Sequence, residues 1–205
     1  MLYIITVCHD AQECPAKPGV SEAQSDLVRC LRRVIEEVKP VFIGEEHSCD
    51  ALNSLGKTSI VKALAHEKKI EHRFCEPTSD ERSERGIKDA GTVKCQAALQ
   101  WAPRDMSDEE AEAVTIACFF PLREAHWLKK LDGCRDQNAI FVCGDLHIEC
   151  GSFTGLLEKE RIPYKLVERG IGMSKELIAS QSRPVRYLME HPELRDCKGV
   201  EECAS

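Results

Sequence analysis

The chain has 205 residues, of which 42% are hydrophobic and 31% are charged, and its formal net charge at pH 7 is −7. This size and composition fit a single domain with a hydrophobic core. The negative charge argues against proteins that hold nucleic acid phosphates or anionic lipid through surface Lys and Arg. We therefore expect no nucleic acid partner and no membrane association.

The apolar run over residues 1–8 is too short for the core of a signal peptide and has no basic region before it. No apolar run approaches the roughly 20 residues that cross a bilayer. We therefore expect a cytoplasmic protein, whose 12 cysteines are mostly reduced thiols in the core. This applies above all to the cysteines in apolar runs, which are Cys30, Cys75, Cys118 and Cys143. Cys197 and Cys203, in a polar tail, are the expected exception.

The first half of the chain alternates between predicted strands and helices. A strand over residues 1–8 is followed by a loop, and a helix then begins at the capping box of Ser21 and runs until Pro40. A short buried strand begins at Val41, and two helical pieces separated near Gly56 come after it. The next predicted strand begins at Ile70. This order favours parallel strands with right-handed helical crossovers.

The second half continues the alternation. The charged segment 78–89 is either a solvated surface or a lid over a site. A capping box at Ser107 begins a long helix towards Leu131, which Pro121 should kink or divide. The last predicted elements are a strand from Ile140, a helix over 151–160, a strand over 163–168 and a helix over 174–188. We predict an α/β fold with a central, mostly parallel sheet flanked by helices, as one domain over 1–205. Residues 171–205 are expected to form a helical arm suited to docking on a second copy in a homodimer.

Two short motifs dominate the functional interpretation. Gly44-Glu45-Glu46-His47 and Gly144-Asp145-Leu146-His147 each follow an apolar strand, and Glu76 ends a third strand. If these strands are parallel, their carboxyl ends bring His47, Glu76 and His147 to one crevice. Glycine at such a point allows a tight strand-to-helix turn, and the first turn of the next helix offers free N–H groups to an anion. The alternative is that both histidines only make hydrogen bonds near helix starts.

The order of these motifs also resembles a known superfamily. Together with Arg123-Glu124, Trp127-Leu128 and Gly155-Leu156-Leu157, they are similar over residues 41–168 to the group that contains TraB and TIKI proteins, erythromycin esterases and ChaN-like haem-uptake proteins. The resemblance implies an α/β fold in which both GxxH histidines, a strand-end Glu and a helix Arg line one pocket. In this chain they correspond to His47, His147, Glu76 and Arg123, and Glu45 matches a Glu that some members carry.

Members of this superfamily differ in chemistry, so the resemblance implies several activities. TIKI-like members are held to be metal-dependent proteases, erythromycin esterases open a lactone with water and need no metal, and ChaN-like proteins bind haem iron. Our leading hypothesis is a small cytosolic hydrolase that activates a water for a small-molecule or peptide substrate. The alternative is a protein that binds haem or a metal without turnover. A third reading is a regulatory module whose crevice is vestigial.

The hydrolase hypothesis has two versions. In the first, His47, His147 and Glu76 hold a divalent ion such as Mn, Zn or Co, and Glu45 or Glu46 is the general base. In the second, one histidine is the base and Arg123 stabilises the oxyanion, together with a helix N-terminus. Arg123 has a structural alternative, in which it pairs with Glu76 or Glu124 and holds a helix on the sheet.

Overall fold

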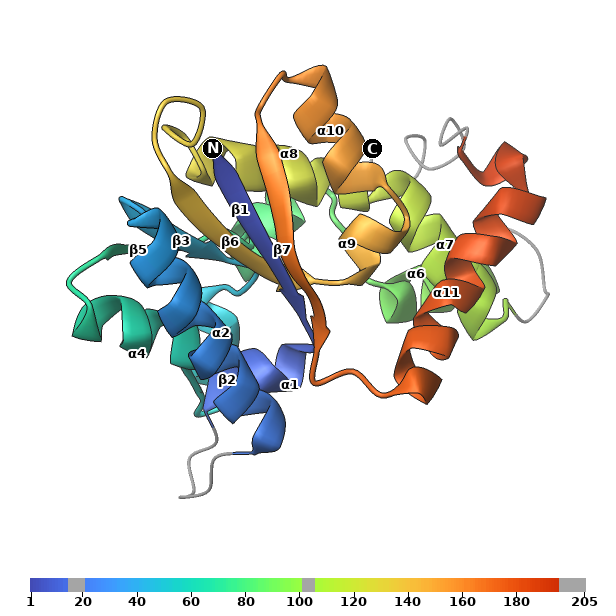
Figure 1. Ribbon diagram of the computed structural model, residues 1–205. Coiled ribbons are helices and arrows are strands. Elements are labelled where there is room, and N and C mark those ends of the chain that lie inside the picture. Colours follow the sequence, from blue (N-terminus) through green and yellow to red (C-terminus); the bar gives the residue numbers. More distant parts are fainter. Residues whose placement is uncertain (15–20, 101–105, 196–205) are drawn as a thin grey trace.

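A central parallel sheet organises the chain, as predicted (Figure 1). The computed structural model describes residues 1–14, 21–100 and 106–195, so Cys197 and Cys203 lie outside the described residues. The strands of the sheet follow one another in space in the order β5-β3-β6-β1-β7, and every pair is parallel. Their bounds are β1 (Leu2–Val7), β3 (Phe42–Glu45), β5 (Glu71–Phe74), β6 (Ala139–Gly144) and β7 (Tyr164–Ile171).

Helices cover both faces of the sheet. One face packs against α2 (Glu22–Val38) and α4 (Ile60–Glu67), and the other against α8 (Phe120–Lys130) and α10 (Ser152–Lys159). Because side chains alternate along a strand, neighbouring residues of β3 enter different cores: Ile43 faces α2 and α4, whereas Phe42 packs towards α8. Burial on both faces explains why the central strands are continuous apolar runs.

Most predicted helix boundaries are confirmed. The Ser21 capping box begins α2, with the Ser21 side chain accepting from the Gln24 N–H. The chain breaks after α3 (Cys49–Ser54), near Gly56, and resumes in α4. Pro121 lies in the first turn of α8 and separates this helix from α7 (Asp108–Cys118), so the long predicted helix is divided in two. Strand β7 reaches Ile171, three residues beyond its predicted end.

A separate group of helices lies beside the sheet (Figure 1). It contains α7, the unpredicted α6 (Ala90–Gln100), α11 (Lys175–Glu190) and the short η1 (Pro192–Arg195). Leu188 of α11 packs with Ala113, Ile116 and Phe120, so α11 is docked on its own chain. The described helices of the segment predicted as an arm, α11 and η1, therefore belong to this helical group, and the homodimer stays a prediction. No helix in the described ranges is both long enough and apolar enough to cross a membrane.

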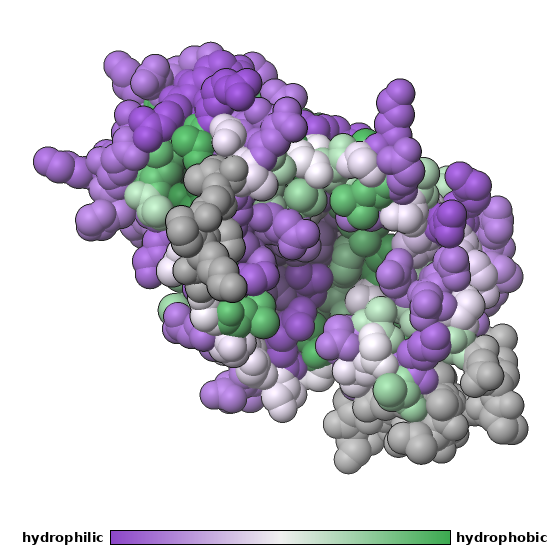
Figure 2. Space-filling view, turned by 90° about the horizontal axis from the view of Figure 1, so that it is seen from below, coloured by the Kyte–Doolittle hydropathy of each residue, from purple (hydrophilic) through white to green (hydrophobic). Residues whose placement is uncertain are grey.

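The position of β6 creates the site. The chain leaves β1 for β3 and β5 on one side, then returns to insert β6 between β3 and β1, before β7 joins the other side. Such a reversal leaves a crevice at the carboxyl ends of the strands, where ligands of open α/β sheets bind. Viewed from this edge, the molecule is hollowed, with hydrophilic side chains in the depth of the hollow (Figure 2). Five short elements complete this edge: α1 (His9–Gln12), α5 (Ser79–Glu84), α9 (Leu146–Glu149) and the paired strands β2 (Glu13–Cys14) and β4 (Thr58–Ser59).

Candidate active site

The strand ladder continues past the strand ends and positions the first site residues. The N–H of Glu46 donates to the carbonyl oxygen of Val142 (2.8 Å), and that of Glu76 donates to the carbonyl oxygen of His47 (3.3 Å). These bonds hold the residues after β3 beside strand β6 and beside the residues after β5. The first GxxH motif and the strand-end Glu are therefore neighbours, as predicted.

Glu45 does not join this group. Adjacent residues on an extended strand point to opposite faces, so Glu45 and Glu46 diverge. Glu45 is fully buried, and its Oε1 lies 2.7 Å from Nε2 of His72, while Glu46 faces α8 and contacts Arg123. Of the two carboxylates proposed as the general base, only Glu46 lines the pocket.

The pocket at this edge has a volume of about 250 Å³. Four of the predicted site residues line it: Glu46, His47, Glu76 and Arg123. Residues from α1, β2, α3 and α5 and their flanking turns complete the lining, namely His9, Glu13, Ser48, Ala51, Pro77, Ser79 and Arg82. The lining residues are thus mostly of polar type and carry charges of both signs.

Arg123 joins the two central carboxylates. Its Nη2 donates to Oε1 of Glu46 (2.6 Å) and to Oε2 of Glu76 (3.0 Å), and its Nε donates to Oε1 of Glu76 (2.9 Å). One turn further along α8, Trp127 Nε1 donates to Oε2 of Glu76 (2.9 Å), which confirms that Arg123 and Trp127 share a face. Burial would lower the pKa of Arg123, but Glu46 and Glu76 outweigh it and raise the pKa. Arg123 is a permanent cation that holds α8 on the sheet edge.

Glu46 is a buried anion surrounded by donors. Its Oε2 accepts from the Gly144 N–H (2.7 Å), and its Oε1 lies 3.3 Å from Nε2 of His147. Burial would raise the pKa of Glu46, but the positive charges of His147, His9 and Arg123 outweigh it and hold the pKa well below its usual range. A carboxylate so stabilised as an anion has little tendency to take up a proton, so Glu46 is a poor general base.

His147 lies behind Glu46 and is enclosed. It is 2% exposed, its Nδ1 lies 2.6 Å from Oε1 of Glu124, and Phe120 stacks on its ring with a centroid distance of 3.8 Å. Burial would lower its pKa, but Glu46 and Glu124 outweigh it and raise the pKa. The two carboxylates therefore favour the imidazolium form of His147, and its side chain does not line the pocket.

His47 has the opposite character. Its Nε2 is buried and has no hydrogen-bond partner among the described residues. Burial lowers its pKa in spite of the nearby carboxylates Glu45, Glu13 and Glu46. His47 is thus neutral at physiological pH and presents an unused ring nitrogen next to the pocket. The His9 ring lies beside it, with a centroid distance of 5.7 Å.

The predicted metal ligands do not fit a divalent ion in this arrangement. Both oxygens of Glu76 accept from Arg123, and further donors come from Trp127 and Arg82. Both nitrogens of His147 face carboxylates. Within the described ranges, no group of three or more His, Cys, Asp or Glu side chains is placed to hold a metal ion. The small charged pocket likewise offers no apolar slot for the plate of a haem.

The two GxxH glycines serve close packing instead of turn geometry. Neither Gly44 nor Gly144 has a positive φ, so the turn that we expected of them is not the reason for glycine. A Cβ on Gly44 would lie 2.7 Å from Leu131 Cδ2 and 2.9 Å from Cys75 Sγ. A Cβ on Gly144 would lie 3.3 Å from both Glu46 Oε2 and His9 Nε2. The absence of a side chain at Gly44 lets Leu131, at the end of α8, pack against strand β3. Its absence at Gly144 leaves room for the Glu46 side chain.

Arg82 and Glu124 are among the residues of the site that sequence analysis missed. Arg82 lies in the charged segment 78–89, which we interpreted as either a solvated surface or a lid. It belongs to α5 and lines the pocket, and its Nη2 lies 3.0 Å from Oε1 of Glu76. Glu124 was considered only as a partner of Arg123, but it pairs with His147 and accepts from Ser152. The i, i+4 pattern of α8 placed Arg123, whereas no local signal links Glu124 with His147.

The comparisons with known proteins add no relative. No protein-family model matches the chain, and neither a curated protein nor a solved structure matches it. The α/β fold is established by the sheet itself, and the resemblance to the TraB, erythromycin esterase and ChaN-like superfamily stays a prediction based on its motifs.

Proposed function

We propose that this protein is a hydrolase in which His47, as the neutral general base, activates a water in the pocket. The observation that carries this proposal is the buried Nε2 of His47, which has no partner among the described residues while the neighbouring Glu46, Glu76 and Arg123 are all paired. A general base needs a free lone pair and a pKa below the working pH, and burial lowers the pKa of His47.

The proposed reaction is the attack of a water on the carbonyl carbon of an ester or amide. The water oxygen forms the new bond to carbon as its proton passes to Nε2 of His47. The bond to the leaving group then breaks, and the His47 imidazolium returns the proton to that group. This sequence consumes one water, leaves the enzyme in its starting protonation state, and follows the pattern of metal-free acid–base hydrolysis.

Arg82 is the best-placed group to stabilise the oxyanion. Its side chain lines the pocket, is 31% exposed and pairs with Glu76 on one side only. Its Nε is buried and has no partner within the described residues. A guanidinium N–H directed at developing negative charge stabilises it strongly in a site shielded from water. Arg123, which is held by two carboxylates, keeps Glu76 and Glu46 in place.

The remaining charges set the electrostatics around His47. His147 lies between Glu46 and Glu124 and favours their ionised forms. The Glu46 carboxylate therefore stays charged and paired with Arg123. Because its charge is balanced by neighbouring cations, Glu46 raises the pKa of His47 less than an unpaired carboxylate would. We therefore assign His47 to proton transfer, and Glu46, Glu76 and His147 to the support of the pocket.

The test is a screen of wild-type protein against esters, lactones, amides and phosphoesters, with elemental analysis and a chelator-treated sample beside it. We expect hydrolysis of an ester or amide that survives chelation, and a loss of about 10²–10⁴-fold in kcat/KM for His47→Gln. His66→Gln, which changes an exposed histidine of α4, is the matched control and should leave the rate unchanged.

Wild-type protein that is inert on every substrate, or a His47→Gln variant with full activity, would contradict the proposal. Activity that chelation abolishes and a divalent ion restores would favour the metal-assisted version instead. A shift of the Soret band when haem is added to wild-type protein, and not to His47→Gln, would favour the binding-protein alternative.

A further inference from the structure

A second cavity, which we call the α4 cavity, lies between α3, β4, α4 and the end of β5. Its volume of about 470 Å³ is larger than that of the candidate active site and lies within the range of small-molecule sites. None of the residues assigned to the hydrolase lines it. The α4 cavity is therefore a separate candidate for ligand binding.

The lining of the α4 cavity carries basic residues without acidic ones. Lys57, Lys62 and His66 line it, and no Asp or Glu of the described residues does, although the net charge of the chain is −7. The acidic residues that are close to the lining in sequence have partners of their own: Asp50 accepts from the Ser79 N–H (2.7 Å), Glu67 from Arg32 (2.8 Å) and Glu71 from Arg73 (2.7 Å). The potential in the α4 cavity therefore favours an anion.

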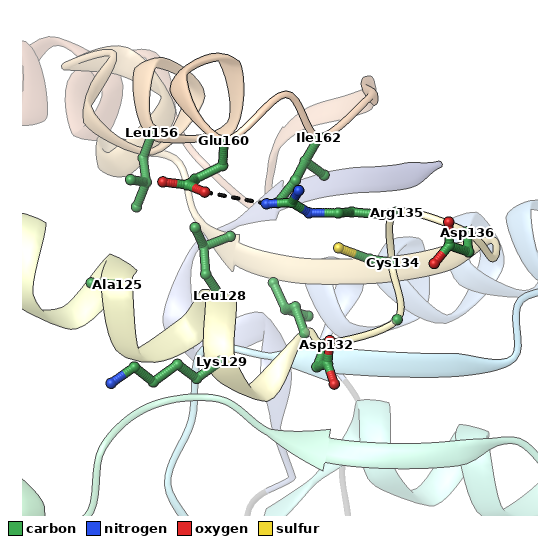
Figure 3. Close-up of a pocket in the computed structure, with 12 residues that line it drawn as sticks. Ala125, Leu128, Lys129, Asp132, Cys134, Arg135, Asp136, Leu156, Glu160 and Ile162 are labelled. Carbon is green, nitrogen blue, oxygen red and sulfur yellow. Dashed lines mark hydrogen bonds and ion pairs between the residues drawn. The ribbon is translucent and has the colours of Figure 1, made fainter.

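A larger cavity, of about 600 Å³, shows the contrast. It lies between α8, the loop 131–136 and α10, where Asp132, Asp136 and Glu160 share the lining with Lys129 and Arg135 (Figure 3). The Nη2 of Arg135 lies 3.2 Å from Oε2 of Glu160, so a carboxylate of the protein already pairs with this guanidinium. Charge selects no ligand in this larger cavity, whereas it selects an anion in the α4 cavity.

Lys62 is a cation that forms no ion pair within the described residues. Its Nζ lies 5.3 Å from the centroid of the Phe74 ring, which also lines the α4 cavity. Lys57 is paired with Glu13, a residue that lines the candidate active site. An ammonium group has three N–H donors, so this pair leaves Lys57 with donors for a ligand. His66 lies one turn after Lys62 on the same face of α4.

We propose that the α4 cavity binds a small phosphate monoester with an apolar body. The phosphate group accepts from Lys57 and Lys62, and the body covers Leu52, Ala63 and Phe74, which supply the apolar part of the lining. The site is independent of the proposed hydrolase reaction.

The donors of the α4 cavity fit a phosphate better than a carboxylate. The planar fork of an arginine matches a carboxylate, whereas a lysine binds phosphate as a point charge, and no arginine of the described residues lines the α4 cavity. A phosphate group carries more than one negative charge near pH 7 and has three acceptor oxygens. It can therefore meet the ammonium groups of two different elements at once.

The test compares phenylphosphonate, which has no ester bond to hydrolyse, with benzoate, benzylamine and inorganic phosphate. Isothermal titration calorimetry measures affinity, and amide chemical shifts locate the site. We expect phenylphosphonate to bind with a dissociation constant on the order of a millimolar or below. Benzoate, with fewer acceptor oxygens, and inorganic phosphate, with no apolar body, should each bind at least about tenfold more weakly. The shifts should concentrate at residues 49–66 and at Phe74.

Two pairs of variants test the charge of the α4 cavity. Ala63 is an exposed position of α4 in the lining, where Glu and Gln have the same size and both suit a helix. Ala63→Glu should weaken the binding of phenylphosphonate at least about tenfold, and Ala63→Gln less than about threefold. Lys62→Gln should also weaken it about tenfold. Lys159→Gln, which removes the same charge from α10 on the other face of the sheet, should change nothing.

Several results would overturn the proposal. Benzoate or benzylamine that binds as tightly as phenylphosphonate would contradict the selection of a phosphate group. Unchanged affinity in both Ala63→Glu and Lys62→Gln would place the probe elsewhere, as would shifts centred on His47 or on the loop 131–136. No shift at about ten millimolar phenylphosphonate would show that the α4 cavity does not bind this class of ligand.

Discussion

The two GxxH motifs have the same spacing and the same position after a buried strand, yet their histidines differ in every physical respect. His147 is enclosed between Glu46 and Glu124, which raise its pKa. His47 has a buried nitrogen without a partner among the described residues, and burial lowers its pKa. The fold favours the charged form of one imidazole and the neutral form of the other. The motif brings a histidine to the edge of the sheet, and burial and the neighbouring charges set its pKa there.

The largest effect expected from this difference is on stability. His147→Gln removes the cation between two buried carboxylates, and breaking a buried charge pair in this way costs about 3–5 kcal/mol. His47→Gln removes no hydrogen bond seen among the described residues and should cost about 1 kcal/mol or less. Urea denaturation of both variants measures the two free energies of unfolding.

If the His147 variant is too unstable to purify, Glu124→Gln keeps the comparison testable. This change leaves a neutral side chain beside His147 and should weaken the charge pair without emptying the space. Where the His147 variant can be purified, the double variant completes a cycle in which the two changes should couple by about 0.5–3 kcal/mol. Equal stability of the His147 and His47 variants would contradict the assigned difference.

The glycines of the two motifs should also differ in how much stability an alanine costs, but by less than the two histidines do. Gly44→Ala places a methyl group against Leu131 and Cys75 in the core, at 2.7 and 2.9 Å, and overpacking of this kind costs about 1–3 kcal/mol. Gly144→Ala meets only Glu46 Oε2 and His9 at 3.3 Å. We expect a smaller loss of stability there and a larger effect on hydrolysis, because the Glu46 side chain must move. Thermal denaturation and a rate assay on both variants measure these effects. A larger loss of stability in Gly144→Ala than in Gly44→Ala would contradict the packing argument.

The pH dependence of stability should have opposite signs at the two histidines. The fold raises the pKa of His147 above its ordinary 6.5, so its contribution is present below 6.5 and is lost as pH rises through the folded pKa. The fold lowers the pKa of His47, so stability falls as pH falls through 6.5 towards its folded pKa. Denaturation midpoints between about pH 5.5 and about pH 8.5 should show a smaller alkaline loss in Glu124→Gln, where Glu46 still acts on His147, and no acid loss in His47→Gln.

The smallest expected change is in the rate above neutrality. A base with a lowered pKa is already deprotonated at pH 7, so kcat/KM should be flat from about pH 7 upward and should fall only below the ordinary histidine range. A profile of kcat/KM against pH measures this. A rate that still rises above pH 7 would assign proton transfer to a group other than His47.

Sequence reasoning succeeded where the signal is local. The capping residues Ser21 and Ser107, the break at Pro121 and the apolar strands follow from neighbouring residues, and they predicted the α/β fold and most helix boundaries. The full capping box formed at Ser21, whereas at Ser107 the serine side chain caps the helix. The i, i+4 spacing of Arg123 and Trp127 correctly placed both on one face, directed at Glu76. Parallel strands with a shared carboxyl edge then brought Glu46, His47, Glu76 and Arg123 to one pocket.

The tertiary structure decided what each of these residues does. Glu45 turns away from the pocket because side chains alternate across the sheet, and the sequence does not say which of two adjacent carboxylates faces α8. The pKa of His147 depends on Glu124 and Glu46, which lie 23 and 101 residues away along the chain, and the pKa of His47 depends first on burial. No local pattern in the sequence records either influence. Charge energies depend on distance in space, so a sequence motif delivers an imidazole to an edge, and only the folded surroundings set its charge.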